Sequence, residues 1–271
     1  MSGVPITDIE EFQHITLNIL SDFNKLCEEF QLQYYLAYGT LIGALRHKGF
    51  IPWDDDIDII MPREEYNRFV TICKSRGEHR YSLLSTETCK NYKSPYPKYI
   101  DNNTELIQQY GFRDDIPMGI YIDIFILDGC SSDLSEAHKV GKTAAKLFHK
   151  WVNASQSLTS SNSGKLISTL KWLKNTPYRM KGSKRYLHEL QDLSAKYPLN
   201  SSRYCSVLIG GYDTVWPVEY FQSGRLTSFE ELNCPIPLMA EKILSDDYGN
   251  YLELPPLEKR KPHHHFEAHW K

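Results

Sequence analysis

The sequence predicts an α/β fold, in which a core of strands and helices is followed by a helical second half. Apolar residues recur at steps of three and four over residues 8–31, which is the spacing of an amphipathic helix. Residues 119–127 consist mostly of β-forming side chains and predict a buried strand. After Gly129 the pattern becomes helical over residues 133–155 and 165–197.

The first elements follow from local signals. Thr7 begins a capping-box pattern at the start of the first helix. Residues 34–38 then predict a strand that Gly39 ends, and Thr40 is expected to cap a short helix extending to residue 46.

The later elements are read in the same way. Residues 56–61 predict a strand, and Pro62 suits the first turn of a helix that continues to residue 75. The Ser/Asn-rich stretch 155–164 predicts a surface loop. The remaining predictions are strands at 81–85, 96–100 and 106–110 and a helix at 238–244.

The domain organisation expected from these elements is a single unit over residues 1–271. It comprises an α/β core at residues 1–130, a helical insertion at 131–203 and a C-terminal part at 204–271.

Composition narrows the function. The chain has 271 residues and a formal net charge of −3, so a non-specific nucleic-acid binder is not expected. No run of 18 apolar residues predicts a membrane span, and the polar N-terminus does not resemble a signal peptide. The six cysteines are scattered, which favours reduced thiols in a cytoplasmic protein.

An acidic cluster at residues 52–59 is the sharpest local feature. On an extended strand Asp56 and Asp58 would share one face, Asp54 would join them at the strand entrance, and Asp55 would point away. Aligned carboxylates repel each other, so a fold tolerates them where a cation lies between them, and oxygen ligands suit Mg²⁺ or Mn²⁺. The alternative is an acidic loop on a solvated surface.

Asp123 is a third carboxylate inside the apolar strand 119–127. A buried carboxylate needs a partner. A metal shared with Asp56 and Asp58 would provide one, and a salt bridge to an Arg or Lys is the alternative. Asp128, at the end of the strand, is interpreted as a turn residue.

Several segments of the sequence resemble those of a known protein family. Residues 38–59 resemble the signature of the LicD family, which includes bacterial phosphocholine transferases and is related to fukutin and fukutin-related protein. Residues 121–128, 248–251 and 255–260 also resemble blocks of the family, in family order. The resemblance covers nearly the whole chain and is weakest over residues 131–203.

The resemblance implies a nucleotidyltransferase-like fold with a mixed β-sheet flanked by helices, in which residues 204–271 complete the site. The Gly39–Thr40 turn would bind phosphate, and Asp56, Asp58 and Asp123 would be the catalytic carboxylates. Together with Asp54 they would bind Mg²⁺ or Mn²⁺, as two ions. The implied reaction passes phosphocholine from CDP-choline to a sugar hydroxyl and releases CMP. The acceptor would be a lipid-linked precursor of teichoic acid, lipopolysaccharide or capsule.

Basic residues supply further candidates. Each of these cations is either a phosphate ligand or a solvated surface charge. His263 and His264 either help to close the site or belong to a surface tail. The candidates for nucleotide or phosphate binding are Arg46, Lys48 and Lys98, and those for closing the site are Lys259, Arg260, His263 and His264.

Choline would require aromatic side chains around its cation. The available residues are Tyr34, Tyr35, Tyr110, Tyr121, Trp216 and Tyr248. Two alternatives stay open: the same chemistry with CDP-ribitol or CDP-glycerol, and an inactive module that binds choline or glycan. A lipid-linked acceptor implies work at the inner face of the membrane. The basic segment 165–187 would either lie on anionic lipid or pack as an ordinary insertion.

Overall fold

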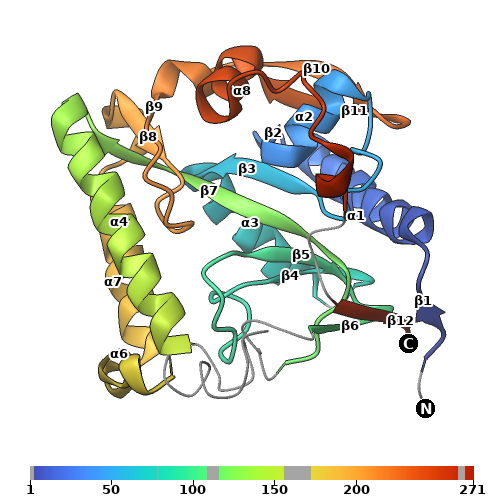
Figure 1. The fold of residues 1–271 in the computed structure, drawn as a ribbon, viewed down its shortest axis with the longest axis horizontal. Coiled ribbons are helices and arrows are strands. Elements are labelled where there is room, and N and C mark those ends of the chain that lie inside the picture. The colour runs from blue at the N-terminus through green and yellow to red at the C-terminus, as the bar shows by residue number, and fades with distance from the viewer. Residues whose placement is uncertain (1–2, 78, 109–115, 156–171, 262–265) are drawn as a thin grey trace.

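The computed structural model describes residues 3–77, 79–108, 116–155, 172–261 and 266–271, and they form a mixed α/β fold as predicted (Figure 1). The α-helices are α1 (Ile9–Glu29), α2 (Tyr38–Arg46), α3 (Arg63–Arg76), α4 (Leu134–Ser155), α6 (Thr176–Lys181), α7 (Ser183–Ala195) and α8 (Ala240–Tyr248). The strands are β1 (Pro5–Ile6), β2 (Tyr35–Leu36), β3 (Asp58–Pro62), β4 (Tyr81–Leu84), β5 (Lys98–Asp101), β6 (Thr104–Gln108), β7 (Tyr121–Ser131), β8 (Tyr204–Ser206), β9 (Trp216–Pro217), β10 (Gly224–Phe229), β11 (Leu232–Pro237) and β12 (Phe266–Trp270). Short 3₁₀ helices lie at Leu199–Ser201, Val218–Phe221 and Leu257–Lys259.

The central sheet has the strand order β2-β3-β7-β5-β4, and β8 and β9 extend it from the far end of β7. β3 and β7 are parallel, whereas the other described pairs in this sheet are antiparallel. β7 pairs with β3, β5 and β8, so its side chains meet three neighbouring strands.

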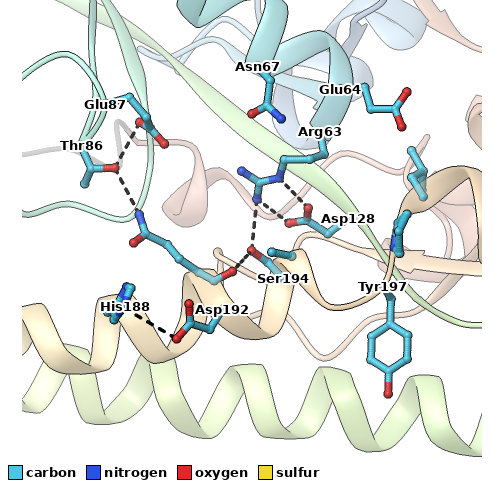
Figure 2. Close-up of a pocket in the computed structure, with 14 residues that line it drawn as sticks. Arg63, Glu64, Asn67, Thr86, Glu87, Asp128, His188, Asp192, Ser194 and Tyr197 are labelled. Atoms are coloured by element: carbon cyan, nitrogen blue, oxygen red, sulfur yellow. Dashed lines mark hydrogen bonds and ion pairs between the residues drawn. The ribbon is translucent and has the colours of Figure 1, made fainter.

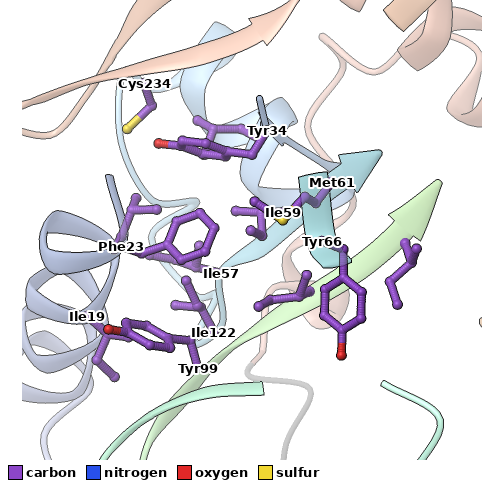
Figure 3. Packing of buried hydrophobic residues seen from close by; sticks show 14 of the residues in the cluster. Ile19, Phe23, Tyr34, Ile57, Ile59, Met61, Tyr66, Tyr99, Ile122 and Cys234 are labelled. Carbon is purple, nitrogen blue, oxygen red and sulfur yellow. The ribbon is translucent and has the colours of Figure 1, made fainter. Parts of the chain in front are cut away.

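One face of this sheet carries the main core. Ile59 on β3 and Ile124 on β7 belong to this core, which α1 and α3 cover. Alternate residues of a strand point to the same side, so the residues on either side of Ile59 and Ile124 point to the opposite face. Figure 3 shows this packing, in which Phe23 of α1 is fully buried. The ring of Phe23 meets those of Tyr34 and Phe69 edge-on, each with centroids 5.0 Å apart.

The other face of the sheet has a separate, smaller cluster. Ile60 of β3 and Phe125 of β7 pack there with Trp216 and Phe221 from the C-terminal part. Asp58 and Asp123 alternate with the residues of the main core, so their side chains belong to this second face. The candidate site therefore lies where the C-terminal part covers the sheet.

Segments distant in sequence complete the fold. α4 packs against α7 and against β7, the β10–β11 hairpin packs against β2, and β12 pairs between β1 and β6. The two ends of the chain consequently lie side by side (Figure 1). The division at residues 130 and 203 stays a prediction.

Several boundaries differ from the sequence prediction. Asp8, rather than Thr7, caps α1 by accepting a hydrogen bond from the Glu10 amide. α2 begins at Tyr38, so Thr40 lies inside its first turn and is not its cap. The predicted helix 165–197 is broken at Gly182, where a φ of 83° separates α6 from α7. The predicted loop 155–164 lies almost entirely outside the described residues.

Among the described helices, none combines the length and the apolarity that crossing a membrane requires.

Candidate active site

Strand register aligns Asp58, Asp123 and Lys98 on three adjacent strands. Asp58 of β3 pairs with Asp123 of β7, and Asp123 pairs with Lys98 of β5. The ammonium of Lys98 lies 2.6 Å from Asp123 Oδ1 and 3.5 Å from the centre of the Tyr121 ring. The salt bridge named as the alternative for Asp123 is thus present, and Asp123 lies beside Asp58 as well.

The charges in this row strongly affect each other. Burial raises the pKa of Asp58 well above its usual value, and the nearby carboxylates of Asp56, Asp123 and Asp54 raise it further. Burial alone would lower the pKa of Lys98, but Asp123 more than offsets this, so the pKa of the ammonium is raised. Lys98 therefore stays charged beside a cluster of carboxylates that repel one another.

The residues before β3 form a compact acidic turn. One carboxylate oxygen from each of Asp54, Asp55 and Asp56 lies within 4.8 Å of the other two. Asp55 therefore does not point away, and that prediction is wrong because the extended strand begins only at Asp58. Carboxylate oxygens so close together are the donor set that Mg²⁺ or Mn²⁺ prefers, so these residues fit the metal.

The start of α2 is built against this acidic turn. A Cβ atom on Gly39 would lie 2.9 Å from Asp54 Oδ2, so a side chain there would displace the carboxylate. The buried Thr40 hydroxyl accepts a hydrogen bond of 2.8 Å from the Asp58 amide and so ties α2 to β3. Tyr38 holds a φ of 47°, a left-handed conformation that is uncommon for a residue with a side chain.

A pocket of about 470 Å³ joins the acidic turn to the C-terminal part of the chain. Its acidic wall comes from the turn before β3, and its aromatic wall comes largely from α8, β9 and the segment before β9. The lining residues are Tyr38, Gly39, Ile51, Trp53, Asp54, Asp56, Asp58, Tyr212, Thr214, Trp216, Asp247 and Tyr248.

The aromatic wall contains a carboxylate of its own. The Trp216 indole N–H donates a hydrogen bond of 3.2 Å to Asp247 Oδ1. Burial raises the pKa of Asp247 to about 6, although this hydrogen bond lowers it. The Tyr212 ring stacks on Tyr38 with centroids 5.4 Å apart and an angle of 28° between the planes.

None of the predicted basic residues lines this pocket in the described part of the chain. Arg46 donates to the carbonyl oxygens of Tyr251 at 2.7 Å and Glu253 at 3.2 Å. The Arg260 guanidinium lies 5.4 Å from the centre of the Trp53 ring, which lines the pocket.

The other predicted basic residues are more distant or not described. Lys48 and Lys259 are exposed and do not line the pocket. His263 and His264 lie outside the described residues. The binding roles of all these residues stay predictions.

Of the aromatic residues considered for choline, only two line the pocket in the described structure, namely Trp216 and Tyr248. Tyr34 and Tyr35 are buried in the two cores, and Tyr121 lies beneath Lys98. Tyr110 lies outside the described residues.

The sequence reasoning did not identify Tyr38, Tyr212 or Asp247 as binding residues. Asp247 had one signal: it directly precedes Tyr248 in a block already associated with the family.

A second, larger pocket of about 690 Å³ lies at the opposite end of β3 and β7 (Figure 2). Within it Arg63 donates to both oxygens of Asp128, at 2.7 and 2.8 Å, and also to Ser194. Asp128 is fully buried inside β7, so its interpretation as a turn residue is wrong. Because the central charges of this pocket are paired with each other, we do not assign it the chemistry.

The basic segment predicted at 165–187 is described from residue 172 onward. Its exposed side chains include the apolar Leu173 and Met180 and the basic Lys174, Lys181 and Lys184.

Comparison with known proteins identifies the class and then the family. The profile described as "LicD/FKTN/FKRP, nucleotidyltransferase domain" matches residues 31–105, which contain the Gly39–Thr40 turn and the acidic turn. Over 273 aligned residues the chain is 31% identical to the lipopolysaccharide cholinephosphotransferase LicD of Haemophilus influenzae, covering 96% of this chain and 97% of that protein. The chain therefore belongs to the LicD family.

Two further relatives are uncharacterized proteins, so their names indicate no activity. An uncharacterized protein of Rickettsia prowazekii is 40% identical over 120 residues, which is 35% of this chain and 45% of that protein. An uncharacterized protein of Rickettsia typhi is 39% identical over 54 residues, or 20% of this chain and 18% of that protein.

Proposed function

We propose that this protein is a metal-dependent phosphotransferase that moves phosphocholine from CDP-choline to a hydroxyl group of a glycan precursor and releases CMP. The observation that carries the proposal is a single pocket in which the carboxylates of Asp54, Asp56 and Asp58 lie opposite an aromatic wall. The similarity to the Haemophilus influenzae enzyme along nearly the whole chain supports the same chemistry.

Asp54, Asp56 and Asp58, with Asp123 on the next strand, would hold Mg²⁺ or Mn²⁺, as two ions. When bound, the metal supplies positive charge that neutralises the diphosphate and the leaving group. The start of α2 faces the same pocket, and the positive end of a helix favours phosphate there. We assign this contact to Gly39 and Thr40.

In the proposed reaction the acceptor oxygen attacks the phosphorus that carries choline, and the bond from that phosphorus to the oxygen of CMP breaks. The hydroxyl proton passes to the carboxylate of Asp123. Lys98, which is bonded to one oxygen of this carboxylate, fixes its position. Positioning of this kind supplies much of the rate in phosphoryl transfer.

Basic residues would bind the nucleotide half of the donor. Partial burial lowers the pKa of Arg46, and the charge of Arg260 lowers it further, which indicates that the two guanidinium groups are close. Two neighbouring guanidinium groups, one of them beside Trp53, suit the phosphate of CMP. Lys48 and Lys259 would extend this basic edge, and His263 and His264 would close over it.

The acceptor determines where in the cell the protein would work. We propose a lipid-linked glycan as the acceptor, by analogy with the substrate in the relative's name. The exposed Leu173 and Met180 beside Lys174 and Lys181 support contact with an anionic membrane surface, on its cytoplasmic side.

A thermal-shift panel tests the donor directly. It would contain CDP-choline, CDP-ribitol, CDP-glycerol, CMP and ATP, each with Mg²⁺, Mn²⁺ or EDTA. A ligand at 100 times its dissociation constant stabilises the fold by about 2.7 kcal/mol, which moves the midpoint by several degrees. We expect metal-dependent stabilisation that is strongest with CDP-choline, followed by CMP release when a lipopolysaccharide acceptor is added. A preference for a CDP-polyol would replace choline as the donor group, and the absence of any response to cytidine nucleotides would overturn the proposal.

A further inference from the structure

The C-terminal end of α8 has an unusual arrangement of charge. Asp246 and Asp247 lie in its last turn, where no basic residue is present. A helix carries a partial negative charge at this end, so carboxylates there are unfavourable. Asp246 is compensated by an ion pair with Lys242 on the same helix. Asp247 instead turns into the pocket.

Asp247 is a half-buried anion that lacks a cationic neighbour among the described residues. Its hydrogen bond comes from the neutral indole of Trp216, and the nearby charge that acts on it is the repulsive one of Asp246. A buried charge without a counter-ion is costly, and a bound cation would remove that cost.

The surroundings of Asp247 specify the kind of cation. Tyr212, Trp216 and Tyr248 line the pocket around it, and the Tyr38 hydroxyl, also in the lining, is buried without a hydrogen-bond partner among the described residues. Aromatic faces attract desolvated cations, and quaternary ammonium groups are commonly bound in this way. A neutral polyol would leave the charge of Asp247 without a counter-ion, whereas a quaternary ammonium group would neutralise it.

We propose that Asp247, Trp216, Tyr248 and Tyr212 form the subsite for a quaternary ammonium group, and that Asp247 is the residue that makes the enzyme select choline over a neutral alcohol. This inference rests on the proposed function, because it takes the donor to be a CDP-alcohol. It adds the residues that determine specificity, which lie on the C-terminal part of the chain and outside the matched segment 31–105.

The rest of the pocket gives the donor a direction. Trp53, Asp54 and Asp247 line the same pocket, and the Arg260 guanidinium lies 5.4 Å from the centre of the Trp53 ring. We assign the nucleotide to the Trp53 side, the diphosphate to the acidic turn and choline to Asp247. An extended CDP-choline has the matching order of groups: a cytidine, a diphosphate and a cation. A competing assignment would stack the cytosine ring on the aromatic wall and use Asp247 to accept from its amino group.

The test is an isosteric charge removal, Asp247→Asn, because asparagine can still accept the hydrogen bond from Trp216. The matched control is Asp246→Asn, the neighbouring carboxylate that faces Lys242. Binding is measured calorimetrically with Mg²⁺ for CDP-choline, for its neutral analogue carrying a tert-butyl group in place of trimethylammonium, and for CMP.

We expect the wild-type protein to bind CDP-choline at least about tenfold more tightly than the neutral analogue. Asp247→Asn should reduce this preference to about twofold and leave CMP affinity unchanged, while Asp246→Asn should behave as wild type. A second variant, Tyr248→Leu, should weaken CDP-choline and leave CMP unchanged.

Each other outcome identifies what is wrong. If CMP and CDP-choline weaken equally in Asp247→Asn, the aromatic wall binds the base and the proposed subsite is wrong. If Asp247→Asn and Tyr248→Leu both keep the wild-type preference for CDP-choline, the subsite lies elsewhere although the proposed function stands. If the wild-type protein binds no CDP-alcohol, the proposed function itself fails.

Discussion

Asp123 and Asp128 are two carboxylates on the same strand, β7, and each is paired with a cation. Asp128 is fully buried and accepts two hydrogen bonds from the planar guanidinium of Arg63. Among the described ion pairs, this pair includes no second carboxylate. Asp123 receives one from Lys98 and adjoins Asp58 across the parallel strand pair. A closed bidentate pair satisfies its own charges, whereas the Lys98–Asp123 pair lies beside surplus negative charge.

The difference indicates how to separate a structural carboxylate from a functional one. Ion pairing alone does not distinguish them, since both Asp123 and Asp128 are paired with a cation. The neighbouring charges do distinguish them. Burial raises the pKa of Asp58, and the carboxylates of Asp56, Asp123 and Asp54 raise it further, a repulsion that folding alone does not require. A site that retains such repulsion is suited to bind a cation.

The largest effect is expected for Asp58→Asn. Removing one ligand of the proposed metal should lower the rate of CMP release by about 10³-fold, in the range found for loss of a preorganised charge-stabilising group. The thermal midpoint of the free protein should stay the same or rise, because one repelling charge disappears. Asp192→Asn, at an exposed carboxylate of the second pocket, serves as the control. Activity within tenfold of wild type would remove Asp58 from the proposed site.

Asp128→Asn should lower the stability of the fold and leave the activity almost unchanged. It leaves the half-buried Arg63 guanidinium without its counter-ion, which costs about 3 kcal/mol of unfolding free energy. The kcat of the folded enzyme should change less than about twofold. Urea unfolding and transfer assays measure the two quantities. The double variant Arg63→Met/Asp128→Leu should recover much of the loss, because it removes both buried charges together.

Lys98→Met distinguishes a positioning role from a phosphate-binding role. If Lys98 holds Asp123 in place, we expect kcat to fall about tenfold with the donor KM little changed. A rise in donor KM with an unchanged kcat would instead show that Lys98 contacts the phosphates in the Michaelis complex. Steady-state kinetics with varied CDP-choline separate these outcomes, and Lys90→Met is a suitable exposed control.

The smallest effect concerns Asp247, a carboxylate that has no described cation. Its folded pKa of about 6 lies above its ordinary value, so this group stabilises the folded state most at low pH and loses that contribution as the pH rises through about 6. Asp247→Asn should therefore raise the unfolding free energy by about 1 kcal/mol at pH 7.5, after allowance for solvent screening, and by roughly a third of that at pH 4.5.

Chemical denaturation at the two pH values checks this prediction. The titratable groups around Asp247 are Asp246 and Tyr248 on α8, Tyr212, and Asp54 and Asp58 across the pocket. The Asp246→Asn control separates the contribution of the adjacent carboxylate. Equal stabilisation by Asp247→Asn at both pH values would show that the effect is not electrostatic.

The sequence by itself predicted the α/β class and most of the elements that carry the site. The amphipathic period of α1, the β-forming run of β7 and the acidic turn before β3 are local signals, because each depends on residues close together in the chain. The same local signals predicted that Asp56, Asp58 and Asp123 belong together, with the family resemblance as support. They failed where one residue decides a boundary, as at Asp8, Tyr38 and Gly182.

Only the tertiary structure decided which partners these residues meet. The pairing of Lys98 with Asp123 depends on the register of β5 against β7, and that of Arg63 with Asp128 depends on the packing of α3. The aromatic wall unites Tyr38 with Asp247 and Trp216, from opposite ends of the chain. No local pattern marks such a contact, because it arises when the C-terminal part covers the second face of the sheet.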